Sequence, residues 1–112
     1  MKTAAFLVFG LSLAFAVLSG FLPNPFEKEP DLTGLPEEGV VLYSTSWCGY
    51  CQQIKQLMDN NSISYTEYDI ESSNLGRKQY KQINGRGVPV MLIDGKILRG
   101  YNPKAVLRLA KK

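Results

Sequence analysis

The chain has 112 residues, which is enough for one small domain and a short extension. Hydrophobic residues make up 45% of it and charged residues 21%, so the composition is that of a globular protein and excludes a disordered chain. The net charge is +3 and the basic residues are scattered, so we expect no nucleic-acid partner. The Lys111-Lys112 pair fits the end of a helix, where positive charge is favourable.

An uncharged apolar run opens the chain. Residues 4–22 are 19 consecutive residues without a charge, and Lys2 precedes them. As a helix the run would be about 28 Å long, close to the roughly 30 Å of a bilayer's hydrocarbon core. Ala14-Phe15-Ala16 also offers a cleavage site of the A-x-A type, as in secretory signals. We therefore expect residues 1–22 to be either a signal anchor, forming an N-terminal hydrophobic helix, or a cleaved signal peptide.

Either role takes the rest of the chain out of the cytoplasm, in a membrane-anchored or secreted form. Lys2 precedes the apolar run and acidic residues follow it, which favours an amino terminus on the cytoplasmic side. The predicted location of the domain is therefore the extracytoplasmic (periplasmic) side of a membrane. Residues 23–38 hold four prolines and five acidic residues, a composition typical of an extended linker. The folded domain is expected to span residues 39–112.

Three elements are expected in the first half of the domain. Residues 40–44 form a β-branched and aromatic run, which is typical of a buried strand. Residues 49–60 carry apolar side chains at helical spacing. Residues 62–70 alternate in polarity, as in a strand with one buried face. The predicted order is therefore strand, helix, strand.

A second helix is expected after this strand. Asp69 or Ser72 is the predicted cap, because short polar side chains accept hydrogen bonds from the first N–H groups of a helix. We expect the helix to run to about Ile83, with Leu75 and Tyr80 facing the core.

A hairpin and a last helix complete the predicted domain. Residues 84–87 predict a turn, and residues 88–93 predict a strand. Asp94-Gly95 is a strong two-residue hairpin signal, so residues 96–99 are the expected return strand. Asn102-Pro103 places an N-cap before a proline at the first helical position. Four apolar side chains supply the buried side of this helix: Ala105, Val106, Leu107 and Leu109.

The two cysteines of the chain, Cys48 and Cys51, lie where the first strand gives way to the first helix. Unpaired N–H groups and the helix dipole favour an anion at that position, and the thiolate is the reactive form of cysteine. A pair at this spacing next to a β-α-β pattern is a fairly specific signal for redox exchange. We therefore predict that both are catalytic. Cys48 would attack a disulfide, and Cys51 would release the partner from the mixed disulfide.

Other interpretations of the cysteine pair stay open at this point. A structural zinc site needs four ligands, and the chain has no histidine and no third cysteine, which argues against zinc within one chain. The pair could still be a static disulfide or two inert core cysteines, or it could share a metal or cluster with a second chain. Each would make the domain a non-catalytic binding module. We predict no metal site.

Three features together resemble the glutaredoxins of the thioredoxin fold: the order β-α-β-α-β-β-α, Cys48-Gly49-Tyr50-Cys51 after the first strand, and Gly87-Val88-Pro89 at the third. The resemblance implies an α/β fold with a four-stranded mixed sheet flanked by helices. It also implies that Pro89 has a cis peptide bond and faces the cysteines. The backbone of Val88 would pair with a bound thiol partner like an added strand. The implied activity is thiol–disulfide exchange with protein or glutathione-mixed disulfides.

The glutathione contacts usual in this family are only partly present. The lysine expected three positions before the first cysteine is Thr45, and the acidic residue expected near the last helix is the neutral Asn102. Pro103 has no N–H to offer a carboxylate, and Asn102 suits a structural cap better than a ligand. Arg86 could replace some of the missing charge. We therefore predict weak glutathione binding, with glutathione kept as a candidate co-substrate.

Two aromatic residues, Trp47 and Tyr50, flank the thiols. In the family such side chains form part of the surface that a partner touches, so both are candidate substrate-binding residues. Dithiol glutaredoxins usually have proline after the first cysteine. This chain has Gly49 there, as in the Trp-Cys-Gly sequence of thioredoxin. In these features the chain is more similar to the glutaredoxin-like redoxins that receive electrons from a protein reductase. Expected partners are protein thiols and disulfides and a membrane-bound reductase, and we expect a monomer without a tightly bound cofactor.

Overall fold

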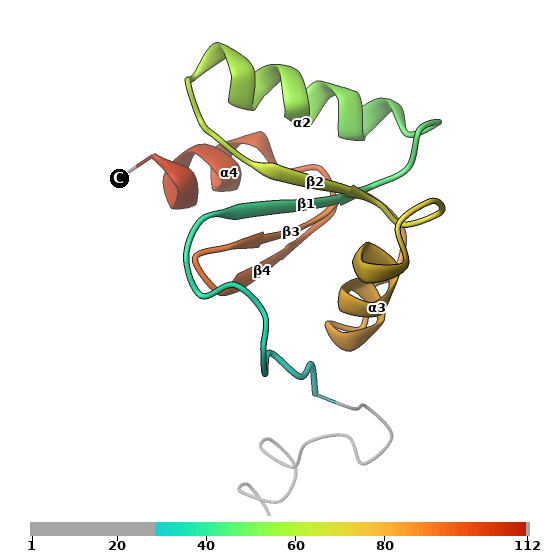
Figure 1. Cartoon of the computed structure of the whole chain (residues 1–112). Coiled ribbons are helices and arrows are strands. Elements are labelled where there is room, and N and C mark those ends of the chain that lie inside the picture. The colour runs from blue at the N-terminus through green and yellow to red at the C-terminus, as the bar shows by residue number, and fades with distance from the viewer. Residues whose placement is uncertain (1–28, 112) are drawn as a thin grey trace, which may run out of the picture.

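The computed structural model describes residues 29–111 of the chain. Within them, helices and strands follow one another in the predicted order β-α-β-α-β-β-α (Figure 1). They are β1 (Val40–Ser44), α2 (Gly49–Asn60), β2 (Thr66–Asp69), α3 (Asn74–Gln82), β3 (Val90–Ile93), β4 (Lys96–Arg99) and α4 (Pro103–Ala110). The boundaries predicted for β1, α2 and β4 agree with the structure.

The strands of the described part form one mixed sheet in the order β2-β1-β3-β4. β1 pairs with β2 in parallel, which sets Leu42 beside Glu67. β3 runs antiparallel to both β1 and β4, which sets Tyr43 beside Val90. Asp94-Gly95 connects β3 to β4 with φ angles of 48° and 80°, the positive values that a tight hairpin turn requires. The predicted α/β fold with a four-stranded mixed sheet is confirmed.

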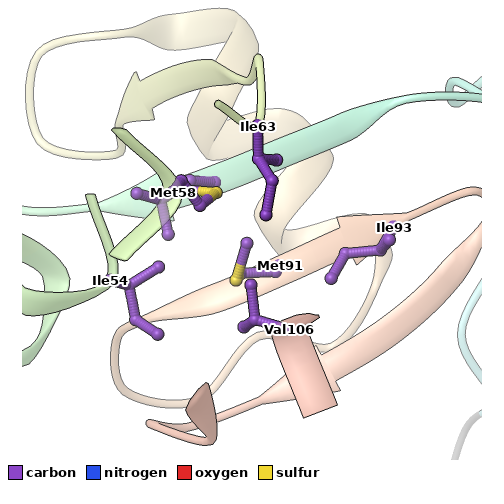
Figure 2. Close-up of a cluster of buried hydrophobic side chains, with 7 residues drawn as sticks. Ile54, Met58, Ile63, Met91, Ile93 and Val106 are labelled. Carbon is purple, nitrogen blue, oxygen red and sulfur yellow. The ribbon is translucent and has the colours of Figure 1, made fainter. Parts of the chain in front are cut away.

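The two faces of the sheet carry separate cores, because successive side chains of a strand point to opposite faces. α2 and α4 cover one face, and α3 covers the other (Figure 1). On the first face, Met91 of β3 packs with Ile54 and Met58 of α2 and with Val106 of α4 (Figure 2). Leu42 of β1 belongs to the same core. This core fixes α2 against the sheet, and with it the helix start where the cysteines lie.

The opposite face has a core that is rich in tyrosine. Tyr43 is fully buried, and the centroid of its ring lies 6.1 Å from that of Tyr68 and 6.4 Å from that of Tyr80. Burial and, to a smaller extent, Tyr68 raise the pKa of Tyr43 to about 12. The Tyr43 hydroxyl therefore stays protonated at neutral pH and donates a hydrogen bond to Gln79 Oε1 at 2.8 Å. This hydrogen bond ties α3 to the sheet.

The second strand is shorter than predicted. β2 comprises Thr66–Asp69, whereas the alternating pattern predicts residues 62–70. Ser62 has a φ of 56°, which lies outside the strand region, and the N–H of Ile63 donates to the carbonyl of Met58. The chain is still turning away from α2 at these residues. An alternating pattern makes a strand only where a neighbouring strand offers partners, and β1 does so from Thr66 onward.

The predicted cap of α3 is also wrong. Ser73 is the N-cap, rather than Asp69 or Ser72, and its hydroxyl accepts the N–H of Gly76 at 2.9 Å. Asp69 instead accepts the N–H of Glu71 at 2.8 Å, in the turn that precedes the helix. The side chain of Asp69 is therefore used to shape the turn and not to start the helix.

The position of the cap decides which side of α3 faces the core. Gly76 is turned toward β2, where a Cβ atom would lie 2.5 Å from the Cβ of Tyr68. Only glycine leaves room for this close approach. Leu75 is exposed, contrary to the prediction, whereas Tyr80 packs against the core as predicted.

The N-terminal assignments remain predictions. Residues 1–22, the expected signal anchor or signal peptide, lie outside the described residues, and within residues 29–111 no helix is long and apolar enough to cross a membrane. The described end of the expected linker packs on the domain. Leu35 is buried in the core under α3, and the N–H of Asp31 donates to the carbonyl of Gln82. The last part of the linker therefore supplies an apolar anchor.

Candidate active site

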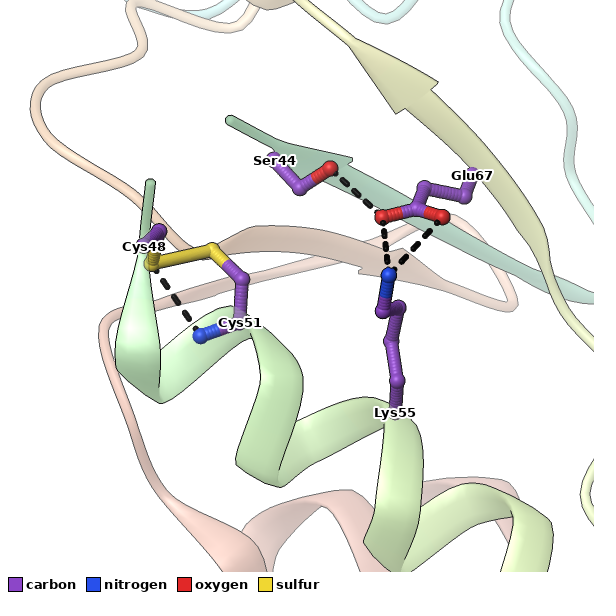
Figure 3. Close-up of polar contacts among 5 residues, drawn as sticks. All are labelled: Ser44, Cys48, Cys51, Lys55 and Glu67. Carbon is purple, nitrogen blue, oxygen red and sulfur yellow. Dashed lines mark hydrogen bonds and ion pairs between the residues drawn. A yellow bond between two sulfur atoms is a disulfide. The ribbon is translucent and has the colours of Figure 1, made fainter. Parts of the chain in front are cut away.

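The chain passes from strand to helix between Ser44 and Gly49, and this passage sets the geometry of the cysteine pair. The N–H of Cys48 donates to the carbonyl of Thr45 at 3.3 Å, which closes a tight turn. Cys48 is the N-cap of α2, and its Sγ accepts the N–H of Cys51 at 3.1 Å. The two sulfurs form a disulfide, with the Cα atoms 5.2 Å apart (Figure 3). The predicted placement of both cysteines in the fold is confirmed.

The two cysteines differ in burial. Cys51 has no exposed surface, whereas 6% of Cys48 is exposed. Of the two, Cys48 is therefore the residue that still has surface for a reaction partner to reach. In the reduced state, a Cys48 thiolate would lie at the positive end of the dipole of α2, which stabilises the charged form. The arrangement suits Cys48 as the attacking sulfur and Cys51 as the internal second thiol.

A turn with a cis peptide bond precedes β3. The Val88–Pro89 bond is cis, as the resemblance implies, and Pro89 is fully buried. Because proline has no N–H to pair with a neighbouring strand, β3 begins at Val90 and not at residue 88. The carbonyl of Pro89 accepts the N–H of Gly100 at 2.9 Å. This bond ties the cis-proline turn to the segment before α4.

Two residues considered for glutathione, Thr45 and Arg86, lie in different surroundings. Thr45 is buried, and its hydroxyl has no hydrogen-bond partner within the described part of the chain. It brings no charge to the site. Arg86 is exposed in the turn before Val88. No contact that the structure describes joins Arg86 to the cysteines.

Asn102 acts as a helix cap. Its Oδ1 accepts the N–H of Ala105 at 3.1 Å, and Pro103 occupies the first position of α4. The cap and the proline are therefore where the sequence predicts them. Because the side-chain amide of Asn102 is already used within the protein, the structural role is favoured over a ligand role.

The aromatic residues Trp47 and Tyr50 extend in different directions from Cys48. Trp47 is 71% exposed, and its indole N–H donates to Glu71 Oε1 at 2.9 Å in the loop after β2. Tyr50 is 56% exposed and stacks on Tyr101, with the ring centroids 4.8 Å apart and the planes at 27°. Sequence reasoning missed Tyr101, whose one signal is its place just before the cap of α4.

A carboxylate beside the first helix was also missed. Glu67 of β2 accepts a hydrogen bond from the Ser44 hydroxyl at 2.7 Å and forms an ion pair with Lys55 Nζ at 3.1 Å (Figure 3). Lys55 lies one turn after Cys51, so both residues lie on the same side of α2. The helical spacing of this pair is visible in the sequence. The contact of Glu67 with Ser44 is not, because it depends on the parallel register of β1 and β2.

Comparison with known proteins identifies the family. The sequence model of the glutaredoxin family matches residues 40–98, which is more than half of the chain. The chain belongs to the glutaredoxin family. A protein named as a glutaredoxin in Mycobacterium tuberculosis is 41% identical over 69 residues, which cover 59% of this chain and 80% of the relative. A glutaredoxin-like protein of the rubredoxin operon of Clostridium pasteurianum is 27% identical over 74 residues, which cover 65% of this chain and 99% of that protein.

The solved structures support the same fold. The glutaredoxin-like protein NrdH-redoxin from Escherichia coli matches with a TM-score of 0.59 at 18% identity, covering 65% of this chain and 96% of the other. At that identity the match shows the thioredoxin-like fold alone. Together with the family and the C-x-x-C pair of Cys48 and Cys51, it makes the protein, in general terms, a glutaredoxin-like thiol–disulfide oxidoreductase.

The difference in burial predicts a difference in reactivity. In the reduced full-length protein, iodoacetamide should modify Cys48 at least about tenfold faster than it modifies Cys51, because thiolate character and exposure control the rate. Peptide mapping by mass spectrometry after short exposures measures both rates. In concentrated urea, where the burial of Cys51 is lost, the two rates should become similar. Two unreactive cysteines in the native protein would contradict an exchange site.

Proposed function

We propose that this protein exchanges disulfides with partner proteins outside the cytoplasm through the Cys48–Cys51 dithiol. The observation that carries this proposal is the sulfur of Cys48 at the start of α2, which accepts the N–H of Cys51. A sulfur in that position is stabilised as a thiolate, both when it attacks and when it leaves. The family of the chain supports the same reaction class.

The reaction consists of two exchange steps. The Cys48 thiolate attacks one sulfur of a substrate disulfide, forms a mixed disulfide and displaces the other sulfur as a thiolate. The Cys51 thiol then loses its proton, attacks the Cys48 sulfur and releases the remaining substrate thiolate. The substrate gains two electrons, and the protein ends with the Cys48–Cys51 disulfide. In reverse, the same steps oxidise a partner.

Because the chain has no histidine to act as a base, proton transfer falls to water or to the Cys51 thiol itself, which gives up its proton before it attacks. Both carboxylate oxygens of Glu67 are engaged, one with Ser44 and both with Lys55. A partly exposed ion pair of this kind contributes at most about 1 kcal/mol to stability. We therefore propose that the Lys55–Glu67 pair helps to position α2 against β2 and has no part in proton transfer. The proposed steps need no metal. Among residues 29–111, no three histidine, cysteine, aspartate or glutamate side chains gather as a metal site.

Three residues favour a protein over glutathione as the preferred partner. At the start of α4, Asn102 already binds the N–H of Ala105, and Pro103 has no N–H. Thr45 is neutral and buried where the family usually has a lysine. The loss of one charged hydrogen bond costs about 1.5–3 kcal/mol, which is roughly ten- to a hundredfold in affinity. Glutathione then serves at most as a weakly bound co-substrate.

The proposed setting is the extracytoplasmic side of a membrane. Its support is the uncharged run of residues 4–22 after Lys2, which acts as a signal anchor or a signal peptide. A reductant in an oxidising compartment needs electrons from elsewhere. We therefore propose a membrane-bound reductase as the electron donor when the protein acts as a reductant. The dithiol chemistry is complete within one chain, and so we propose a monomer.

The cysteine roles can be separated by serine substitutions. Cys48→Ser should abolish the dithiothreitol-driven reduction of insulin by the full-length protein, because the attacking sulfur is lost. Cys51→Ser, reduced and then freed of dithiothreitol, should retain the first step with insulin and accumulate a mixed disulfide at Cys48, seen as added mass. Leu75→Ala, on the exposed surface of α3, is the control and should act like wild type. If wild type reduces insulin no faster than Cys48→Ser does, the domain is a non-catalytic module.

Glutathione affinity can be measured without exchange in the Cys48→Ser, Cys51→Ser protein. Calorimetric titration with reduced glutathione should give weak binding. Adding Thr45→Lys should tighten it about tenfold, because a charged hydrogen bond becomes available. Thr45→Met, which has similar length and no charge, is the matched control and should leave the affinity unchanged. Tight, glutathione-specific binding by the protein with Thr45 would refute this assignment.

The setting can be tested with a reporter that is active only outside the cytoplasm. Alkaline phosphatase fused to the C-terminus of the full-length chain should be active in a bacterial host, because residues 1–22 direct export. Deletion of these residues should abolish the phosphatase activity while the fusion is still produced. An inactive full-length fusion, with an active β-galactosidase fusion at the same position, would place the domain in the cytoplasm.

A further inference from the structure

Exposed aromatic side chains gather around the candidate active site. Within residues 29–111, the aromatic residues with large exposed surfaces are Trp47, Tyr50 and Tyr101, the last of them 41% exposed. The first two belong to the segment that holds Cys48, and the third contacts Tyr50. Aromatic side chains held in one orientation are typical anchors for a protein partner.

Tyr101 is held between two fixed neighbours. Gly100 has a φ of 79°, which glycine adopts without strain, and its N–H donates to the carbonyl of Pro89 at 2.9 Å. On the other side, Asn102 caps α4. The Tyr101 ring stacks on Tyr50 of the first turn of α2. The two rings, here called the tyrosine wall, therefore join the cis-proline turn and the starts of α2 and α4.

The aromatic groups are tied to different parts of the fold on either side of Cys48 in the sequence. The indole N–H of Trp47 donates a hydrogen bond to Glu71 in the loop that leads to α3, whereas Tyr101 lies just before α4. α3 and α4 cover opposite faces of the sheet (Figure 1). A polypeptide that presents a sulfur to Cys48 therefore approaches a site with exposed aromatic surface from more than one element.

The chemistry of the tyrosine wall suits an apolar group. Arg99, the cation nearest in sequence, donates to the carbonyls of Asn84 and Ile83 at 3.0 and 2.7 Å, so its guanidinium serves the fold. Asn102 is neutral and used as a cap. The exposed faces of offset-stacked rings accept a further aromatic or aliphatic side chain.

We propose that Tyr101 is a specificity-determining residue, which with Tyr50 binds an aromatic or large apolar side chain next to the reacting cysteine of a protein disulfide. The proposal rests on the dithiol exchange at Cys48 described above. It assigns the tyrosine wall to the sequence around the substrate cysteine, in addition to the substrate sulfur itself. A flanking ring that packs on the wall orders the peptide before the sulfurs meet.

Two peptides of equal length test this assignment. Each carries a central cysteine joined by a disulfide to thionitrobenzoate, and the cysteine is flanked by phenylalanine in one peptide and by glycine in the other. The pre-reduced full-length protein supplies both electrons. Cys48 attacks the peptide sulfur and displaces the coloured thionitrobenzoate, and Cys51 then displaces the peptide thiol. The rate constant of each release is divided by that with free dithiothreitol, which removes the intrinsic reactivity of the peptide.

We expect wild type to prefer the phenylalanine peptide about tenfold. In Tyr101→Ala the preference should fall below about threefold, because the wall loses one of its two rings. Tyr101→Phe keeps the ring and should keep the preference, as should Leu75→Ala on α3. If the alanine variant loses cooperative unfolding in urea, Tyr101→Gln takes its place.

The possible outcomes separate this inference from the function on which it rests. Equal rates for both peptides in wild type, or an unchanged preference in Tyr101→Ala, would overturn the role of Tyr101 and leave exchange at Cys48 intact. If the reduced protein releases no thionitrobenzoate from either peptide, the proposed function itself fails.

Discussion

The hydrogen bond from the N–H of Cys51 to the sulfur of Cys48 connects the fold of α2 with the chemistry of the site. The first N–H groups of a helix need acceptors from outside the helix, and here one acceptor is the reactive atom itself. A thiolate accepts such a bond more strongly than a disulfide sulfur does, because it carries charge. Reduction therefore strengthens the cap. The stability of the first turn of α2 is in this way coupled to the redox state of the pair.

The parts of the fold that depend on local chemistry could be predicted from the sequence. β1 follows from a β-branched run, and Asp94-Gly95 is a local hairpin signal that the structure confirms. The start of α3 could not be predicted, because several short polar side chains compete to cap it. Packing decides between them, since only a helix capped by Ser73 brings Gly76 against Tyr68. The length of β2 depends in the same way on tertiary structure, because its pairing with β1 begins only at Thr66.

The residues of the candidate site also differ in whether their roles depend on local sequence or on tertiary contacts. Cys48 and Cys51 belong to one short continuous motif, so their placement at the start of α2 could be predicted before any contact was known. The cis bond before Pro89 is implied by the family resemblance. Tyr101 could not be recognised, because its part arises from contact with Tyr50 across elements that are far apart in the sequence. Nothing in the residue alone distinguishes it from an ordinary exposed tyrosine. Glu67 likewise becomes visible only when the parallel register brings its side chain to Ser44.

Two helices begin at the site, and the contrast between their caps bears on recognition. The cap of α2 is the reactive sulfur of Cys48, whereas the cap of α4 is the inert side-chain amide of Asn102. A carboxylate that approaches α4 must displace Asn102 to reach the N–H of Ala105, so it gains one hydrogen bond by breaking another. The rings of Tyr50 and Tyr101 present no such competition. Their outer faces are in contact with water, and covering them releases that water. The exposed rings therefore favour an apolar side chain at this end of the site.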